Sequence, residues 1–394
     1  MAHGTRSLFR RFSADWIRFD RNELAGSFGD IGTDLPLILA MIPAAGLDLP
    51  SVFILFGAVQ ILTGILYGLP MPMQPLKAMA VLVITERLSG DVLAGGGLAI
   101  GLMMLVLSLS GALSWLSRAI PLGVVRGIQF GLGLSLVSLA LKTYVPAEGG
   151  AGYALAAVAF VLTLVFWGNR RFPAALFVIG LGALYALIGN PGIFSSFTEV
   201  KIALPVLQAP ALSDIWTGLL VLALPQLPLS LSNSVFATER TLKDLYPERK
   251  ISIRKIGVTY SLANMILPFF RAIPVCHGCG GLAGHYAFGA RTGGSVILYG
   301  AMYLLIGLFF SSAANDILQV FPKPVLGVVL FFEALILLRF IADVARSRRE
   351  LTIALIVAAL SFTLPQGFLI GLLVGVALSY ASRRFRILDE HLAR

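Results

Sequence analysis

Stretches of about 20 mostly apolar residues recur along the whole chain, and they restrict its fold more than any other feature of the sequence. A helix needs ~20 such residues to cross the hydrocarbon core of a bilayer. Hydrophobic residues make up 57% of the chain and charged residues only 13%, whereas a soluble globular domain carries about 25% charged residues. The sequence therefore predicts an all-α polytopic protein whose solvent is the lipid bilayer.

The apolar stretches predict fourteen transmembrane segments joined by short polar loops. No cleaved secretory signal is expected, because the N-terminal region is rich in arginine and its first apolar run contains polar groups. The predicted segments are residues 24–46, 50–69, 70–88, 91–115, 119–141, 151–167, 172–189, 213–237, 252–270, 274–290, 293–313, 324–342, 349–362 and 365–381.

The net charge of +10 is a topology signal rather than a sign of nucleic-acid binding. With a cytoplasmic N-terminus, 23 of the 30 Lys and Arg residues fall on the side of both termini and five on the opposite side. Lys77 and Arg126 lie within predicted segments. This bias follows the positive-inside rule and predicts that both termini are cytoplasmic. The short loops and the Ala- and Arg-rich composition indicate a bacterial inner membrane.

The order of the segments predicts two halves of opposite orientation. Seven segments precede the longest non-cytoplasmic loop and seven follow it, so the second half runs through the membrane in the reverse sense. Inverted repeats of this kind are common in secondary transporters. The predicted regions are a cytoplasmic N-terminal segment, a first repeat, a linker, a second repeat and a cytoplasmic tail, at residues 1–23, 24–189, 190–212, 213–381 and 382–394.

Irregular sequences interrupt four predicted segments at matched positions in the two halves. The first and eighth segments contain FGDIGTDLP and LPQLPLSLSNS, and the third and tenth begin with PMPMQPLKAMA and IPVCHGCGGLAG. Gly and Pro are tolerated singly in membrane helices, which is an adequate explanation for any one of the four. Their matched placement favours a substrate site where broken helices of the two halves meet.

The third and tenth segments are each predicted to contain a half-helix that starts inside the membrane. Proline suits the first turn of a helix, so Pro75 marks the expected start in the third segment. In the tenth segment, glycines allow a ligand to approach the backbone closely. A helix N-terminus carries about +0.5 of an elementary charge, so two facing starts form an anion site. The glycines expected at this site are Gly278, Gly280 and Gly281.

Lys77 adds a full positive charge beside these helix starts. Together with the two helix ends it supplies about +2, enough to balance a dianion. Gln74 precedes it and is a second expected contact of the anion. The alternative is that Lys77 extends toward the membrane surface or is neutralised by an acidic neighbour.

The first segment carries two carboxyl groups one helical turn apart, Asp30 and Asp34, with Thr33 beside them. Carboxylates within a membrane are costly and usually functional. We expect the two acids to couple protons to transport and Thr33 to contact the substrate. One of the acids has a structural alternative, as a helix cap or as the partner of Lys77.

In the eighth segment, polar residues form one stripe with helical spacing: Gln226, Ser230, Asn233 and Ser234. The first three are expected at the substrate site. Ser and Asn also hold membrane helices together, which is the alternative role. Gln226 lies between two prolines that free backbone carbonyls, and such carbonyls must line a polar cavity.

The sequence CHGC at 276–279 does not predict a metal site or a haem site. A zinc site needs further ligands, and the chain has no second such cysteine pair. We expect the two cysteines to be small packing residues and His277 to donate to the substrate. No phosphate-binding loop of nucleotide hydrolases is present, so no cofactor is expected and a gradient should drive transport.

The four irregular segments, with CHGCGGLAGHYAFGARTGG in the tenth, resemble the signature segments of the molybdate transporter family, which is related to the sulfate permeases. The resemblance extends from about residue 24 to 380. It implies a seven-plus-seven inverted repeat with a core domain, formed by segments one to four and eight to eleven, and a gate domain formed by the others. It further implies an oxyanion between the half-helices of segments three and ten, and a homodimer. The regulatory domain that sulfate permeases usually carry after the last segment is expected to be absent.

The expected function is therefore import of molybdate by proton symport, with Asp30 as the coupling acid. Sulfate is the main alternative substrate, because both oxyanions are tetrahedral dianions. A passive anion channel and a membrane-embedded enzyme that uses Asp30, Asp34 and His277 are the remaining alternatives. No nucleophile or metal ligand with suitable spacing supports the enzyme.

Overall fold

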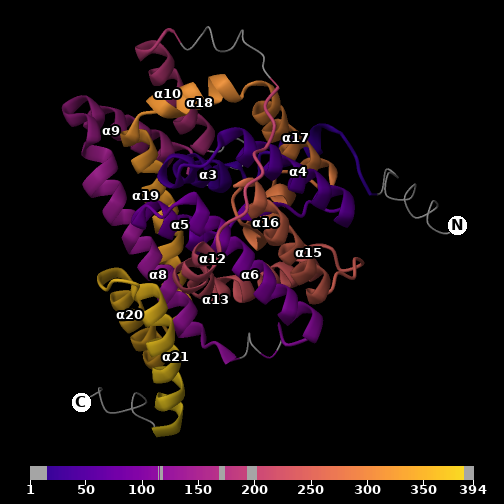
Figure 1. Ribbon diagram of the computed structural model, residues 1–394, viewed down its shortest axis with the longest axis vertical. Helices are drawn as coiled ribbons and strands as arrows, with labels where there is room; N and C mark the ends of the chain where they lie inside the picture. Colours follow the sequence, from indigo (N-terminus) through magenta and orange to yellow (C-terminus); the bar gives the residue numbers. More distant parts are fainter. Residues whose placement is uncertain (1–15, 114, 116–118, 168–173, 193–201, 386–394) are drawn as a thin grey trace, which may run out of the picture.

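The computed structural model describes residues 16–113, 115, 119–167, 174–192 and 202–385. Most of this part of the chain is helical, and the helices α20 and α21 lie at the opposite end of the molecule from α10 and α18 (Figure 1). The predicted N-terminal segment and C-terminal tail lie mostly outside the described residues.

The first half of the chain forms helices of very different length. Its longest continuous α-helix has 21 residues, whereas α5, which follows the third-segment prolines, has only 10. The helices are α2 (Arg21–Gly26), α3 (Ile31–Ala45), α4 (Leu49–Tyr67), α5 (Lys77–Glu86), α6 (Gly90–Ser110), α8 (Leu122–Leu139), α9 (Gly149–Val165) and α10 (Ala174–Gly189).

The second half contains the remaining helices, and every predicted segment overlaps at least one helix of the structure. These helices are α12 (Leu212–Gly218), α13 (Leu224–Leu229), α14 (Thr238–Leu245), α15 (Ile253–Ile266), α16 (Cys279–Ala287), α17 (Gly294–Phe309), α18 (Ser311–Val320), α19 (Lys323–Arg339), α20 (Arg348–Thr363) and α21 (Gly367–Phe385). Short π-helical turns are η1 (Ala140–Tyr144), η3 (Leu219–Ala223) and η4 (Ser230–Ala237), and 3-10 turns are η2 (Val145–Glu148), η5 (Leu267–Phe270) and η6 (Phe340–Val344).

Five helical stretches in the described residues are long and apolar enough to cross a membrane. They are Leu49–Tyr67, Gly90–Ser110, Leu122–Val165, Leu212–Leu245 and Lys323–Val344, and shorter apolar helices cover Thr33–Ala45, Phe177–Gly189 and Gly294–Phe309. The chain is thus a mostly helical membrane protein, and the count of fourteen segments stays a prediction.

Two three-residue strands correct the prediction of an all-α fold. They are β1 (Met73–Pro75) and β2 (Val275–His277), which pair with each other. Proline lacks the N–H that a helix needs and pushes the residue before it toward extended backbone. The proline-rich entry to the third segment is therefore extended, and its partner strand satisfies the backbone groups that no helix can satisfy.

The helices pack as two groups. In the first group α4 lies along α17 and α6 along α15, and in the second α8 and α9 pack against α19, with α20 beside α8. Figure 1 shows α8, α9 and α19 on one side of the molecule and α4, α15 and α17 on the other. Small residues allow close packing in the first group, since a Cβ added to Gly57 would lie 2.5 Å from the carbonyl oxygen of Gly300.

Local capping residues set the limits of several helices. Asp48 accepts the N–H of Ser51 at 2.9 Å at the start of α4. Gly46 and Gly68 end α3 and α4 with φ values of 62° and 60°, in the left-handed region that glycine adopts without steric cost. The capping residues provide hydrogen-bond partners for backbone groups at the helix ends that have no partner within the helix.

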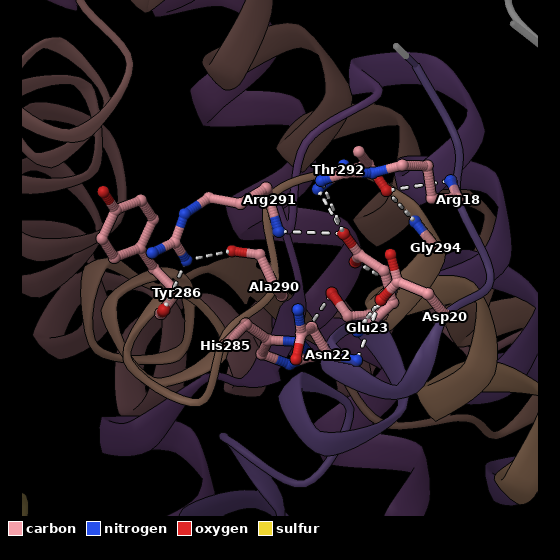
Figure 2. A network of polar contacts seen from close by, with 11 residues as sticks. Arg18, Asp20, Asn22, Glu23, His285, Tyr286, Ala290, Arg291, Thr292 and Gly294 are labelled. Atoms are coloured by element: carbon pink, nitrogen blue, oxygen red, sulfur yellow. Dashed lines mark hydrogen bonds and ion pairs between the residues drawn. The ribbon is translucent and has the colours of Figure 1, made fainter. Parts of the chain in front are cut away.

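A buried carboxylate joins the N-terminal part of the chain to the start of α17. Glu23 of α2 accepts the N–H groups of Arg291 and Thr292, each at 2.9 Å, and that of Ser295 at 3.0 Å (Figure 2). The guanidinium of Arg18 lies 3.9 Å from the same carboxylate. A negative charge at a helix N-terminus is favourable, so Glu23 fixes the connection between α16 and α17.

Changing Glu23→Gln should lower the thermal stability of the purified protein. The amide replaces one accepting oxygen by a donor that faces backbone N–H groups, and loss of a charged hydrogen bond costs about 1.5–3 kcal/mol. Thermal unfolding in detergent measures the change, with the exposed Glu148→Gln as control. Equal unfolding temperatures for the two variants would contradict the structural role of Glu23.

Candidate functional site

The centre of the candidate site is the two-stranded ribbon and the helices that leave it. β1 and β2 are antiparallel, with Gln74 opposite Cys276 as the middle pair. Helix α5 begins at Lys77 and α16 at Cys279, each two residues after its strand ends. Pro75 was expected to start the helix, but it is the last residue of β1 instead. The helix begins after it because the chain stays paired up to Leu76, whose N–H donates to Pro274 at 3.0 Å.

Two side-chain amides hold the first residue of each strand in the same way. Gln60 of α4 donates to the carbonyl oxygen of Met73 at 2.6 Å and accepts its N–H at 2.9 Å. Asn264 of α15 donates to the carbonyl oxygen of Val275 at 2.6 Å and accepts its N–H at 2.9 Å. Both amides are fully buried. They satisfy backbone groups that the membrane interior would otherwise leave without partners.

The start of α5 is capped by Gln226 of α13. The Gln226 Oε1 atom accepts the N–H groups of Ala78 and Met79 at 2.9 and 3.3 Å. Its Nε2 atom donates to Ser230, which is bonded in turn to the hydroxyl of Tyr260 at 2.8 Å. These two N–H groups were expected to be open to an anion, and that expectation is corrected, because a neutral amide from the eighth segment already occupies them.

The start of α16 is more open. Gly278 is its N-cap residue, and a Cβ at Gly280 would meet no atom within 4 Å. Asn233 of η4 lies beside this turn and accepts the Cys279 thiol at 3.1 Å. The first turn of α16 therefore offers backbone donors next to open space.

Asp30 connects α3 to the ribbon. It is the N-cap residue of α3, is 3% exposed, and its Oδ1 atom accepts bonds from Gln74 at 2.6 Å and from Thr33 at 2.7 Å. Its Oδ2 atom has no hydrogen-bond partner among the described residues. The carboxyl group lies beside the first turn of α16, because a Cβ at Gly281 would meet it. The structure thus brings Asp30, Gln74 and Thr33 together at the helix starts.

Asp34 lies one turn further along α3, where it interacts with the carboxyl group of Asp30 and with a pair of tyrosines. The hydroxyl of Tyr299 donates to its Oδ2 atom at 3.3 Å, and Tyr303 lies 3.2 Å beyond Tyr299. Helix α3 continues through Pro36 to Ala45 without a break. Asp34 caps no break and instead begins a buried chain of hydroxyl groups.

Lys77 is half-buried at the first position of α5. Its ammonium group interacts electrostatically with both Asp30 and Asp34. Arg126, the other cation that the charge count assigns to neither side of the membrane, pairs with Asp343. Lys77 is therefore the cation that accompanies the two acids at the helix starts.

His277 does not lie with the other predicted residues. Side chains alternate along a strand, so His277 projects from the opposite face of the ribbon to Gln74 and Cys276. Its ring nitrogens lie 2.7 Å from the hydroxyl of Thr259 and 3.4 Å from the carbonyl oxygen of Pro72. The ring also packs edge-on against Tyr67 at 5.3 Å. These contacts give His277 a packing role in the structure, and we leave it out of the proposed site.

The residues that sequence reasoning missed are single polar residues in otherwise apolar stretches. Gln60, Asn264 and Tyr299 hold the strands and the acids, but each of them lies within a continuous helix. An apolar run of twenty residues gives no reason to select one amide within it. These residues could have been recognised only from the general rule that a polar side chain buried in a membrane segment must have a hydrogen-bond partner.

Comparison with known proteins bears on what this arrangement does. A family model described as "Molybdate transporter of MFS superfamily" matches residues 22–136 and 218–337, more than half of the chain. The chain belongs to this molybdate transporter family. The two matched ranges contain both strands and both short helices of the site.

Individual proteins agree with this membership. Molybdate transporter 2 of Arabidopsis thaliana is 34% identical over 414 residues, which cover 93% of this chain and 88% of the relative. The fold resembles the transmembrane domain of the cyanobacterium bicarbonate transporter BicA, with a TM-score of 0.65, 17% identity and coverage of 92% and 98% of the two chains. It also resembles the murine anion transporter Solute Carrier 26 family member A9, with a TM-score of 0.69, 16% identity and coverage of 97% and 70%.

These findings decide between the broad classes of function. The expected resemblance to molybdate transporters is confirmed, and the chain is a multi-pass membrane transport protein rather than an enzyme. The roles of individual site residues, the coupling ion and the membrane in which the protein resides stay predictions.

The geometry predicts opposite outcomes for two neighbouring glycines. A Cβ at Gly281 would lie 2.8 Å from Cγ atoms of both Asp30 and Pro72, so Gly281→Ala should destabilise the protein by about 1–3 kcal/mol through overpacking. Gly280→Ala adds its methyl group to open space and should leave stability unchanged or slightly raised, because alanine favours helix. Thermal unfolding in detergent compares the two, and equal behaviour would show that α16 does not pack on Asp30 as described.

Proposed function

We propose that the protein imports molybdate as a proton-coupled secondary active transporter, with the anion bound between the starts of α5 and α16. The observation that carries this proposal is the β1–β2 ribbon with a helix start two residues beyond each strand and Lys77 at one of them. Backbone donors and a fixed cation at facing helix starts form a site for a small oxyanion. Family membership supplies molybdate as the substrate class.

An inverted repeat of two seven-segment halves agrees with the matched contacts around the ribbon. Gln60 and Asn264 hold the first residues of the two strands with the same pair of hydrogen bonds. The packing is reciprocal as well, since α4 lies along α17 and α15 along α6. Such correspondence is expected when two similar halves are related by an axis in the membrane plane. We assign α5 and α16 as the half-helices of the third and tenth segments.

The two helix starts serve the anion differently. The Gln226 amide occupies the N–H groups of Ala78 and Met79 but carries no charge, so α5 still contributes about +0.5 of an elementary charge through its dipole. Direct backbone contacts then come from Gly280 and Gly281 of α16, with Asn233 nearby. Lys77 supplies the full charge, and Gln74 and Thr33 hold Asp30 beside the anion.

Alternating access requires that one group of helices moves against the other. We assign the group that contains the ribbon, α2 to α6 and α12 to α17, as the core domain and α8 to α10 with α18 to α21 as the gate domain. The groups pack mainly within themselves. A homodimer, cytoplasmic termini and a bacterial inner membrane complete the proposal and rest on the sequence alone.

Sulfate is the second candidate substrate, since charge and tetrahedral shape are shared. Counterflow of labelled molybdate in proteoliposomes, with sulfate as competitor, separates the candidates. Stronger inhibition by unlabelled molybdate than by sulfate is expected. Equal inhibition would assign a general oxyanion transporter, and absence of counterflow with rapid leak would assign a passive channel.

Lys77→Gln should weaken molybdate binding while the protein remains folded. Loss of a charge-assisted contact costs roughly 1.5–3 kcal/mol, or about ten- to a hundredfold in affinity. Calorimetric titration of the purified protein measures the affinity, and exposed Lys142→Gln is the matched control. Binding that is the same in both variants would assign Lys77 a role at the membrane surface instead.

The coupling follows from the position of Asp30. An ionised carboxylate beside a dianion in a region of low dielectric is repelled strongly at a few ångströms. The anion and a proton on Asp30 therefore raise each other's affinity, as linkage requires. The competing arrangement is a permanent ion pair with Lys77, in which neither group exchanges a proton.

Asp30→Asn tests the coupling with little structural change. Its remaining Oδ1 atom can still accept from Gln74 and Thr33, and the new amide group replaces an oxygen that has no partner among the described residues. Uptake should lose its response to an inward proton gradient while molybdate exchange continues. Asp34→Asn measures the contribution of the second acid, and the exposed Asp244→Asn serves as control and should keep the response. A full response in Asp30→Asn would exclude Asp30 as the coupling acid.

A further inference from the structure

A polar cavity lies at the far end of α16 from the ribbon. Helix α16 has nine residues, so about 13 Å separates its start from its end. The cavity has a volume of ≈ 320 Å³ and opens between the ends of α4, α14 and α16 and the segments that precede α2 and α17. Its lining residues include three arginines and two tyrosines: Arg18, Tyr246, Arg249, Tyr286 and Arg291.

Two of the arginines, Arg249 and Arg291, are held by aromatic rings and backbone carbonyl groups rather than by carboxylates. Arg291 lies 3.6 Å over the Tyr286 ring and donates to the carbonyl oxygens of Tyr286 and Ala290 (Figure 2). Arg249 lies 4.3 Å over the Trp16 ring and donates to a backbone carbonyl. Neither forms an ion pair with a carboxylate of the described residues, within 4.0 Å. Both guanidinium groups are thus fixed and keep their positive charge.

The acids that face the cavity leave an excess of positive charge. Glu248 is the acidic lining residue among those described, and it acts on Arg249. Glu23 lies beneath the cavity, where three backbone N–H groups and Arg18 satisfy it. Because Arg18 is paired with Glu23, Arg249 and Arg291 against Glu248 leave a formal charge of about +1, which favours an anion such as a phosphate group.

The hydroxyl of Tyr246 is an independent sign of a missing acceptor. Tyr246 is 5% exposed, and its hydroxyl has no hydrogen-bond partner among the described residues. Burial raises the pKa of Tyr246, so the group keeps its proton near neutral pH and is available as a donor. A buried polar group without a hydrogen-bond partner is rare, and it indicates that a bound molecule supplies the partner. The hydroxyl interacts with Arg291, Glu23 and Glu248, which places it among the charges of the cavity.

We propose that this cavity binds a phosphate monoester group, held by Arg18, Arg249 and Arg291 and by the hydroxyl of Tyr246. Arginine recognises phosphate through planar pairs of N–H donors. The positive-inside distribution predicts that the cavity opens at the cytoplasmic edge of the membrane, where anionic lipid headgroups are present. The phosphate therefore belongs either to a lipid headgroup or to a free phosphorylated solute, and it links α14 to the connection between α16 and α17.

Thermal unfolding of the full-length protein in detergent tests this proposal. The probes are short-chain phosphatidic acid, inorganic phosphate and short-chain phosphatidylcholine, at matched ionic strength. The variants are Tyr246→Phe, Arg291→Gln and, as control for binding at the molybdate site, Lys77→Gln. Tyr246→Phe should be at least as stable as the parent without ligand, because it removes a buried hydroxyl that lacks a partner.

We expect phosphatidic acid or phosphate to raise the unfolding temperature of the parent and of Lys77→Gln. The apparent affinity should fall about fivefold in Tyr246→Phe and about tenfold or more in Arg291→Gln. A rise with phosphatidic acid alone identifies a lipid headgroup, and a rise with both identifies any phosphate monoester. The proposal is overturned if neither exceeds phosphatidylcholine, if both cavity variants respond like the parent, or if Lys77→Gln removes the response.

Discussion

Backbone groups that leave a helix inside a membrane must find partners within the protein, and the β1–β2 ribbon meets this demand. The strands satisfy each other in part, and Gln60 and Asn264 satisfy the first residue of each strand. Because the ribbon is fixed from both sides, the starts of α5 and α16 have defined positions. The open first turn of α16, the charge of Lys77 and the contacts of Asp30 all depend on this arrangement, as does the proposed anion site.

Buried charge is distributed unevenly along α16. At its start, Asp30 lies beside Gly281 with one oxygen that has no partner among the described residues. Beyond its end, Glu23 accepts three backbone N–H groups and is fully satisfied. A satisfied carboxylate stabilises the fold, whereas one with an open oxygen can respond to a proton or an anion. This difference is the physical reason for assigning coupling to Asp30 and a structural role to Glu23.

Sequence reasoning predicted the helical segments and most of the residues around the helix starts. Lys77 and the glycines at 278, 280 and 281 are recognisable because they charge or interrupt an apolar stretch. Asp30 is recognisable because a carboxylate within a membrane is costly. The capping of α5 by Gln226 was missed, since a side chain from the eighth segment meets the third only in the folded protein. His277 was grouped with the site by its motif, but the alternation along β2 directs it to the opposite face.

The amino-acid sequence by itself determined that this is a mostly helical membrane protein of the molybdate transporter family, because hydropathy and short motifs are local properties of the chain. Tertiary structure decided which polar groups remain available. Gln226 and Ala78 are about 150 residues apart in sequence and meet through packing, as do Asp30 and Gly281. A hydrogen bond between distant segments occupies backbone N–H donors that, judged from the sequence alone, would be free to bind a substrate. The sequence therefore determines which polar residues the candidate site contains, and the tertiary contacts determine which of their groups remain free to bind an anion or a proton.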